Sequence, residues 1–229
     1  MISFQLIAFI FAFVAPLVSA EPPLFVCKDE SCDTSKAVMD LPPSQTALVA
    51  PAIAPLFVLL GVGVQNYTCS GTTFASIGAV ASFFDISCLA GTSKFDTIQN
   101  TTFKVWGRVP SSVPSTAIGA LVGAPYLDGV FPLLRHPSSG TSISPKWDFT
   151  STGKFAGNST AFVIGVKVGD ILASTNPAAD IDWLRLARVE GDLASHVFRV
   201  DTVGGQPPTS CVSGSPPISV KYTSKYYLF

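Results

Sequence analysis

Apolar and polar positions alternate along much of the second half of the chain, and this period of two residues predicts β-strands. In the clearest run, residues 218–228, aromatic and aliphatic side chains alternate with Lys221, Thr223 and Lys225. Such alternation places one face of a strand against a core and the other toward solvent. Four shorter runs predict further strands, at residues 103–108, 161–168, 182–188 and 197–203.

Residues 59–69 predict a buried strand around which the other strands would be arranged. Apolar residues lead into this segment, and Gly61 and Gly63 permit the close approach of a neighbouring backbone. Cys69 can anchor its end through a disulfide bond. We therefore expect this strand to lie at the centre of the fold.

The fold class follows from the strands and from the turns between them. Asp128-Gly129, Gly191-Asp192 and Gly204-Gly205 are turn-forming pairs. No segment shows a sustained helical period with caps, and residues 77–90 fit either a short strand or one helical turn. The pattern predicts an all-β, single-domain β-sandwich or barrel with an irregular N-terminal lead-in.

Composition divides the chain into three parts. Residues 1–20 carry no charged side chain and end in small residues, which is typical of a signal peptide cleaved after Ala20. Residues 21–45 are rich in proline and predict an irregular segment, and residues 46–229 predict the single β domain. We therefore expect a secreted protein that resides outside the cell or in its wall.

A long apolar run, residues 46–64, has the length of a membrane helix. Pro51 and Pro55 interrupt it, and an irregular lead-in to a buried strand accounts for them better than a lipid-exposed helix does. We expect no membrane span in the mature chain. The 14 basic and 15 acidic residues are scattered without a basic cluster, which argues against binding to nucleic acid.

Five cysteines in the predicted mature part suggest two disulfide bonds and either one remaining thiol or one intermolecular bridge, because secreted proteins are oxidised. The preferred pairing joins Cys69 to Cys88, and Cys211 to Cys27 or Cys32. We expect no metal site, because the Cys27/Cys32 pair has no second closely spaced pair. Three glycosylation sequons fit a secreted protein, at Asn66, Asn100 and Asn158.

Several segments resemble a group of secreted, fungal-type proteins, the family DUF3455, a domain of unknown function. The segments that carry this resemblance are residues 61–69, 78–90, 182–186, 199–208 and 220–227. The similarity covers about residues 40–229, and none of its motifs is diagnostic of a chemical reaction. It implies a secreted domain without an assigned activity.

Some members of that family carry the label malate dehydrogenase, but this sequence does not support nucleotide chemistry. Gly61 and Gly63 are followed by Asn66 where a dinucleotide-binding turn needs a third glycine, and no alternation of strands and helices surrounds them. We therefore expect no cofactor. The resemblance also implies a histidine near residues 122–126, whereas the first histidine here is His136.

The chain lacks a recognisable catalytic constellation. It has no Gly-x-Ser-x-Gly motif, and only His136 and His196 could act as imidazole bases. Asp180 and Asp182, two residues apart on one predicted strand face, leave open a glycan-acting hydrolase that uses Asp and Glu carboxylates. The carboxylates near turns that could join them are Asp170, Glu190 and Asp192.

Aromatic residues on the predicted strands suggest a binding function instead. Trp106, Trp147 and Tyr226 could stack on sugar rings if they are exposed, whereas Trp183 fits the core better. The leading hypothesis is therefore a non-catalytic, secreted glycoprotein, stabilised by disulfides, that binds carbohydrate or cell-wall material. The glycan-acting hydrolase remains the alternative.

Overall fold

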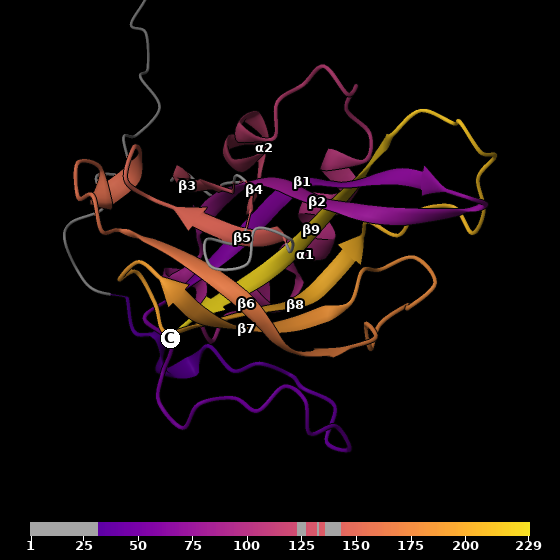
Figure 1. Cartoon of the computed structure of the whole chain (residues 1–229). Coiled ribbons are helices and arrows are strands. Elements are labelled where there is room, and N and C mark those ends of the chain that lie inside the picture. The colour runs from indigo at the N-terminus through magenta and orange to yellow at the C-terminus, as the bar shows by residue number, and fades with distance from the viewer. Residues whose placement is uncertain (1–31, 123–126, 132, 136–142) are drawn as a thin grey trace, which may run out of the picture. The chain divides into compact units, whose positions relative to one another are not determined.

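The computed structural model describes residues 32–122, 127–131, 133–135 and 143–229. Nine strands form one antiparallel sheet in the order β3-β2-β1-β9-β8-β7-β6-β5-β4 (Figure 1). The sheet nearly closes into a barrel, because a single residue pair, Val130 with Asp148, joins β3 back to β5. The predicted all-β class is confirmed, and the described compact unit begins at Cys32.

Strands are the main secondary structure of the described residues, with a few short helices between them. The strands are β1 (Phe57–Ser70), β2 (Thr73–Asp85), β3 (Leu127–Phe131), β4 (Leu133–Arg135), β5 (Ile143–Asp148), β6 (Phe162–Ile171), β7 (Trp183–Glu190), β8 (His196–Gly204) and β9 (Ile218–Leu228). The helices are α1 (Ser93–Trp106), α2 (Thr116–Leu121) and three 3-10 turns, η1 (Thr34–Lys36), η2 (Ser87–Leu89) and η3 (Gly153–Phe155). No helix of the described residues is long and apolar enough to cross a membrane.

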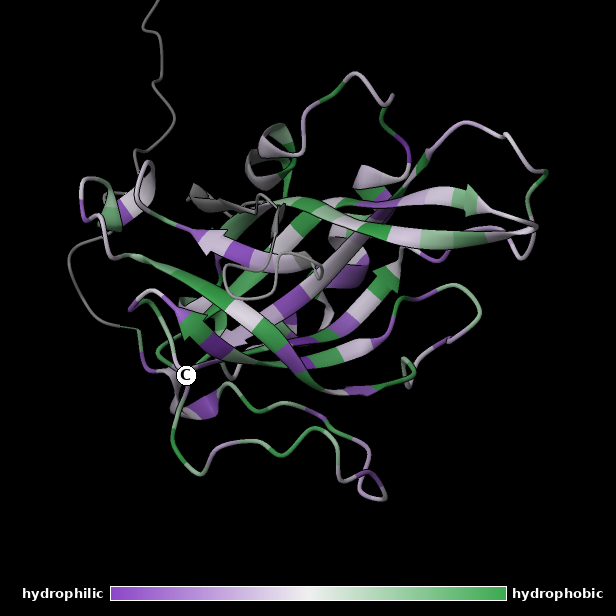
Figure 2. Cartoon of the chain, viewed as in Figure 1, coloured by the Kyte–Doolittle hydropathy of each residue, from purple (hydrophilic) through white to green (hydrophobic). Residues whose placement is uncertain are grey.

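Strand β1 is buried on both faces because it lies between β2 and β9 and divides two hydrophobic clusters. Leu59 belongs to the inner cluster, to which β1, β2, β5, β6, β7, β8 and β9 contribute. Val58, Leu60 and Val62 belong to the outer cluster, which α1 and the N-terminal segment cover. Figure 2 shows the resulting alternation of hydrophobic and hydrophilic residues along the strands. The predicted central role of residues 59–69 is therefore correct.

The two glycines of β1 allow aromatic side chains and a neighbouring backbone to pack closely, as expected. A Cβ atom at Gly63 would overlap the carbonyl oxygen of Val80 on β2, and one at Gly61 would meet the ring of Tyr226. The carbonyl oxygen of Gly63 also accepts a hydrogen bond of 2.9 Å from the indole Nε1 of Trp106. Glycine at these positions is therefore required by space rather than by backbone torsion.

Helix α1 occupies residues for which the sequence predicted a strand, so the prediction for residues 103–108 is wrong. The Thr92 side chain accepts a hydrogen bond from the backbone N–H of Phe95 and caps the helix. The buried positions of the helix recur with a helical period, but Gln99 and Thr102 are among them. These polar residues interrupt the apolar period that would have indicated a helix.

The disulfide bonds are Cys32–Cys88 and Cys69–Cys211, so the preferred pairing of Cys69 with Cys88 is wrong. The hairpin of β1 and β2 explains the difference. Cys69 lies near its turn, opposite Phe74, whereas Cys88 follows the far end of β2, so the hairpin holds the two apart along its length. Cys27 lies outside the described residues.

Candidate functional site

A pocket of about 510 Å³ lies inside the barrel and is the strongest candidate site in the described part of the chain. Its walls come from β1, β2, β5, β6, β7, β8 and β9. Polar groups contribute about as much of its surface as apolar groups. The volume falls in the range of small-molecule sites, which occur in the mouths of β-barrels.

The pocket lies where the barrel wall is incomplete. Strand β3 pairs with β2 only along residues 81–84, and β5 pairs with β6 only along residues 162–164. The first half of β2 and the second half of β6 therefore have one edge without a strand partner among the described residues. Ser76 on β2 and Lys167 on β6 both line the pocket. We infer that the mouth lies between these two edges.

Arg199 on β8 points into the barrel, because it alternates with Phe198 and Val200 of the outer cluster. Its guanidinium donates from Nε and Nη2 to the backbone oxygen of Asp182, at 3.3 and 2.8 Å. These bonds join β8 to the start of β7 and fix the orientation of the guanidinium. The inward-pointing cation is therefore held in place by backbone rather than by a carboxylate.

Asp182 contributes a second polar group to the pocket. Its Oδ1 atom is buried and has no hydrogen-bond partner among the described residues. No ion pair of the described residues joins its carboxylate to Arg199. Burying an acceptor without a donor is costly, so an orphaned carboxylate oxygen beside a cavity indicates a place for a ligand's donor group.

Aromatic side chains form the deeper wall of the pocket. The rings of Trp147 and Tyr226 meet edge to face with centroids 6.1 Å apart, and Tyr226 also shares a hydrogen bond of 2.9 Å with the hydroxyl of Tyr222. Gly165 of β6 leaves room for the Trp147 ring, since a Cβ atom there would lie 3.3 Å from it. These rings are almost completely buried, so they support the pocket wall from behind.

The tyrosines around the pocket are held in the neutral form. Burial raises the pKa of Tyr67 to about 12; Arg199 opposes this increase and Asp182 adds to it. Burial likewise raises the pKa of Tyr222 and Tyr226, with the nearby Arg199 acting in the opposite direction. The Tyr67 hydroxyl, as a neutral donor, forms a 2.7 Å bond to the backbone oxygen of Gly205.

The raised pKa of Tyr67 predicts a loss of stability in alkali. The unfolded chain releases the phenolic proton near pH 10, whereas the native state keeps it until about pH 12. The stabilisation is therefore complete below pH 10 and is lost as pH rises toward 12, at about 1.4 kcal/mol per pH unit. We expect wild type to lose about 1 kcal/mol more stability than Tyr67→Phe between pH 10 and pH 11 in urea denaturation, because the unfolded phenol is only half ionised at pH 10. Equal losses of stability in wild type and Tyr67→Phe would contradict the raised pKa of Tyr67.

Of the aromatic residues predicted to bind, two line the pocket and one does not. Trp147 and Tyr226 lie in the pocket wall, each with 1% of its surface exposed. Trp106 lies on α1 with 4% exposed and with the Lys221 ammonium 4.2 Å from its ring, so it is not the exposed stacking surface that a strand would have provided. Trp183 donates to Thr202 in the core, as expected.

The predicted modification sites fall on different surfaces. Asn100 on α1 and Asn158 after η3 are exposed, whereas Asn66 on β1 is half-buried and accepts a hydrogen bond from Ser219. Glycosylation at all three stays a prediction.

The candidate acids and bases are mostly engaged in structural contacts. Asp180 accepts hydrogen bonds from the Gly204 N–H and the Thr175 hydroxyl. Asp170 pairs with Lys167 at the mouth of the pocket, and Asp192 pairs with Arg188. Glu190 is exposed at the end of β7, His196 is half-buried on β8, and His136 lies outside the described residues. The described residues hold no group of three metal-ligating side chains.

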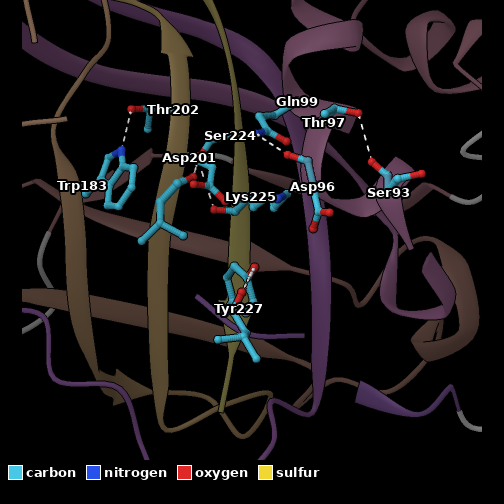
Figure 3. A network of polar contacts seen from close by, with 12 residues as sticks. Ser93, Asp96, Thr97, Gln99, Trp183, Asp201, Thr202, Ser224, Lys225 and Tyr227 are labelled. Carbon is cyan, nitrogen blue, oxygen red and sulfur yellow. Dashed lines mark hydrogen bonds and ion pairs between the residues drawn. The ribbon is translucent and has the colours of Figure 1, made fainter. Parts of the chain in front are cut away.

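A second polar cluster lies under α1, outside the barrel (Figure 3). The Lys225 ammonium is 3.1 Å from the carboxylate of Asp201 and 4.6 Å from the centre of the Phe95 ring. Lys225 is only 3% exposed, and Asp201 has a left-handed backbone with φ of 51°. Because this ion pair is buried and covered by α1, we interpret it as structural.

The pocket could be predicted from the sequence only in part. The sequence identifies Asp182 as a candidate acid and Trp147 and Tyr226 as candidate ligand-binding residues. It does not identify Arg199. The sequence feature that could identify Arg199 is a charged residue between Val197 and Val200, at a strand position that faces the barrel interior. Recognising it required knowledge of which strand face lines the barrel.

The family model described as "Protein of unknown function (DUF3455)" matches residues 50–229. No curated protein and no solved structure matches the chain.

Proposed function

Since the chain belongs to the DUF3455 family, whose function is unknown, we propose that it is a secreted, non-catalytic binding protein whose ligand occupies the barrel pocket. The observation that carries this proposal is the pocket of about 510 Å³ with its inward Arg199 and the orphaned oxygen of Asp182. A fixed cation and an unsatisfied acceptor supply orientation and specificity for a small ligand, and the half-buried Phe74 and Leu184 supply contact area.

Secretion is supported by the cysteines and by the N-terminal sequence. Two disulfides fit an oxidising compartment, and the uncharged segment of residues 1–20 has the layout of a signal peptide. Three sequons are consistent with a glycoprotein outside the cell or in its wall. A pocket, however, favours a discrete ligand over the surface of a wall polymer, because Trp106 does not form an exposed strip.

The alternative is a glycan-acting hydrolase that uses carboxylates of the same pocket. Asp182 and Asp170 both line it, which is the observation in favour of this alternative. Asp170, however, is neutralised by Lys167, and hydrolysis needs one carboxyl that donates a proton and a second that acts as base or nucleophile. Binding requires no such division of roles and accounts for Arg199 as well.

Filling the pocket tests the binding function. Leu184 lines the pocket, whereas Val189 on the same strand is 42% exposed on the surface. We expect Leu184→Trp to abolish binding of small ligands, and Val189→Trp to leave it unchanged. The measurement is saturation-transfer NMR with a mixture of neutral disaccharides, sugar acids, aliphatic acids and aliphatic amines. Binding that survives in Leu184→Trp, or no binding by wild type, would contradict a ligand in this pocket.

A further inference from the structure

The charged side chains of the pocket balance one another. Two are basic and two are acidic, and Lys167 and Asp170 form an ion pair at the mouth. Arg199 and Asp182 remain inside, close enough for both to act on the pKa of Tyr67 yet not paired with each other. An anionic ligand would meet the carboxylate of Asp182 and a cationic one the guanidinium of Arg199, so the pocket favours a ligand without net charge.

Hydrogen bonding narrows the ligand further. Arg199 is a donor only. It donates two bonds to the backbone of Asp182 and also hydrogen-bonds the hydroxyl of Tyr226, and its remaining N–H groups are left for a ligand acceptor. The Oδ1 atom of Asp182 is an acceptor only and needs a donor. Hydroxyl groups both donate and accept hydrogen bonds. Two neighbouring hydroxyl groups of one molecule can therefore accept from Arg199 and donate to Asp182.

The remaining surface suits a ring with an apolar face. The half-buried Phe74 presents an aromatic ring and Leu184 adds aliphatic surface, whereas Trp147 and Tyr226, each 1% exposed, lie behind this surface. Sugar rings combine hydroxyl groups around the edge with C–H groups on the face, which match polar and aromatic walls respectively. The volume of about 510 Å³ suits one or two such rings rather than a long polymer.

We propose that the ligand is an uncharged sugar of one or two rings, whose hydroxyl groups are bound by the Asp182 carboxylate and the Arg199 guanidinium. This inference rests on the proposed binding function and adds the class of ligand and the two residues that recognise it. It assigns Asp182 to recognition of a donor and not to acid catalysis.

Calorimetric titration of the whole protein with individual compounds tests this assignment. The probes are cellobiose, maltose, laminaribiose, xylobiose and N,N′-diacetylchitobiose, compared with gluconate, hexanoate and hexylamine. We expect at least one neutral disaccharide to bind ten times more tightly than any charged probe, with an affinity that changes less than twofold between 0.15 and 1 M NaCl.

Two isosteric or near-isosteric variants identify the residues. Asp182→Asn removes the charge of the acceptor and Arg199→Lys removes the planar donor, and each is expected to weaken sugar binding at least tenfold. Control measurements with Val189→Lys, on the exposed end of the same strand, should give wild-type affinity. Unfolding midpoints of all variants distinguish loss of binding from loss of fold.

The outcomes separate the two proposals. If a charged probe binds in the pocket and the disaccharides do not, the sugar assignment is wrong while the binding function stands. If no compound binds, or if binding is indifferent to Leu184→Trp, both are wrong. Sugar binding that persists in Asp182→Asn and Arg199→Lys would overturn the roles given to these residues. Release of reducing sugar from a bound disaccharide by wild type would contradict the proposal that the protein is non-catalytic.

Discussion

Asp201→Asn is expected to lower the free energy of unfolding by about 3 kcal/mol, because it leaves the buried ammonium of Lys225 without a counter-charge. Lys225 is 3% exposed under α1, and the 3.1 Å contact to Asp201 is its one ion pair in the described part. Asparagine keeps the shape of the side chain and tolerates the φ of 51° at this position. The substitution therefore changes the charge and not the shape of the side chain. Urea denaturation at pH 7 measures the resulting loss of stability.

A surface ion pair and a double variant serve as controls. Asp170→Asn, at the exposed pair with Lys167, should change stability by less than about 1 kcal/mol. Lys225→Met combined with Asp201→Asn should recover most of the loss, since it removes the stranded charge. If Asp201→Asn costs no more than Asp170→Asn, the pair under α1 is not desolvated as its burial indicates.

Replacing both Cys69 and Cys211 by serine is expected to lower the free energy of unfolding by about 4 kcal/mol. The bond joins residues 142 positions apart, and a loop of this length restricts the unfolded chain strongly. The bond also ties the turn of the β1–β2 hairpin to the segment before β9, where the Cys211 N–H donates to Thr72. Urea denaturation of the oxidised proteins measures the difference.

The second disulfide provides a matched comparison. Cys32 and Cys88 are 56 positions apart, so the chain-entropy model expects their replacement to cost about 0.8 kcal/mol less than that of the longer loop. Both double variants keep the charge of the protein. Equal stability of wild type with and without a reductant that breaks both bonds would contradict the stabilising role.

The strands could be predicted where one face is apolar and the other polar. The alternation of apolar and polar residues predicted β6, β7, β8 and β9 correctly. The glycines of β1 correctly indicated a strand that neighbouring groups approach closely. The alternation at residues 103–105 wrongly predicted a strand, because Phe103 and Val105 fit a period of two by coincidence within α1. The helix buries Gln99 over the polar cluster that contains Lys225 (Figure 3), and Thr102 is buried as well, so its buried face lacks the apolar period.

The disulfides and the pocket depend on which segments meet in space, which local patterns do not specify. Cys69 and Cys88 are neighbours in sequence, yet a long hairpin keeps them apart. Arg199 and Asp182 meet because β7 and β8 are adjacent, and Trp147 of β5 lines the same pocket because the sheet curves around it. A sequence pattern identifies the strands but not the side on which the barrel closes.

The position of β9 between β1 and β8 also constrains how the protein can be made. Residues Phe57 to Tyr67 of β1 pair with partners that the ribosome adds more than 150 residues later. Until then, one edge and both apolar faces of β1 are exposed, and pairings of such long range form slowly. Assembly of the barrel must therefore follow synthesis of nearly all of the domain. Chaperones that shield β1 until β9 has been synthesised are the cellular factors on which the yield of folded protein should depend.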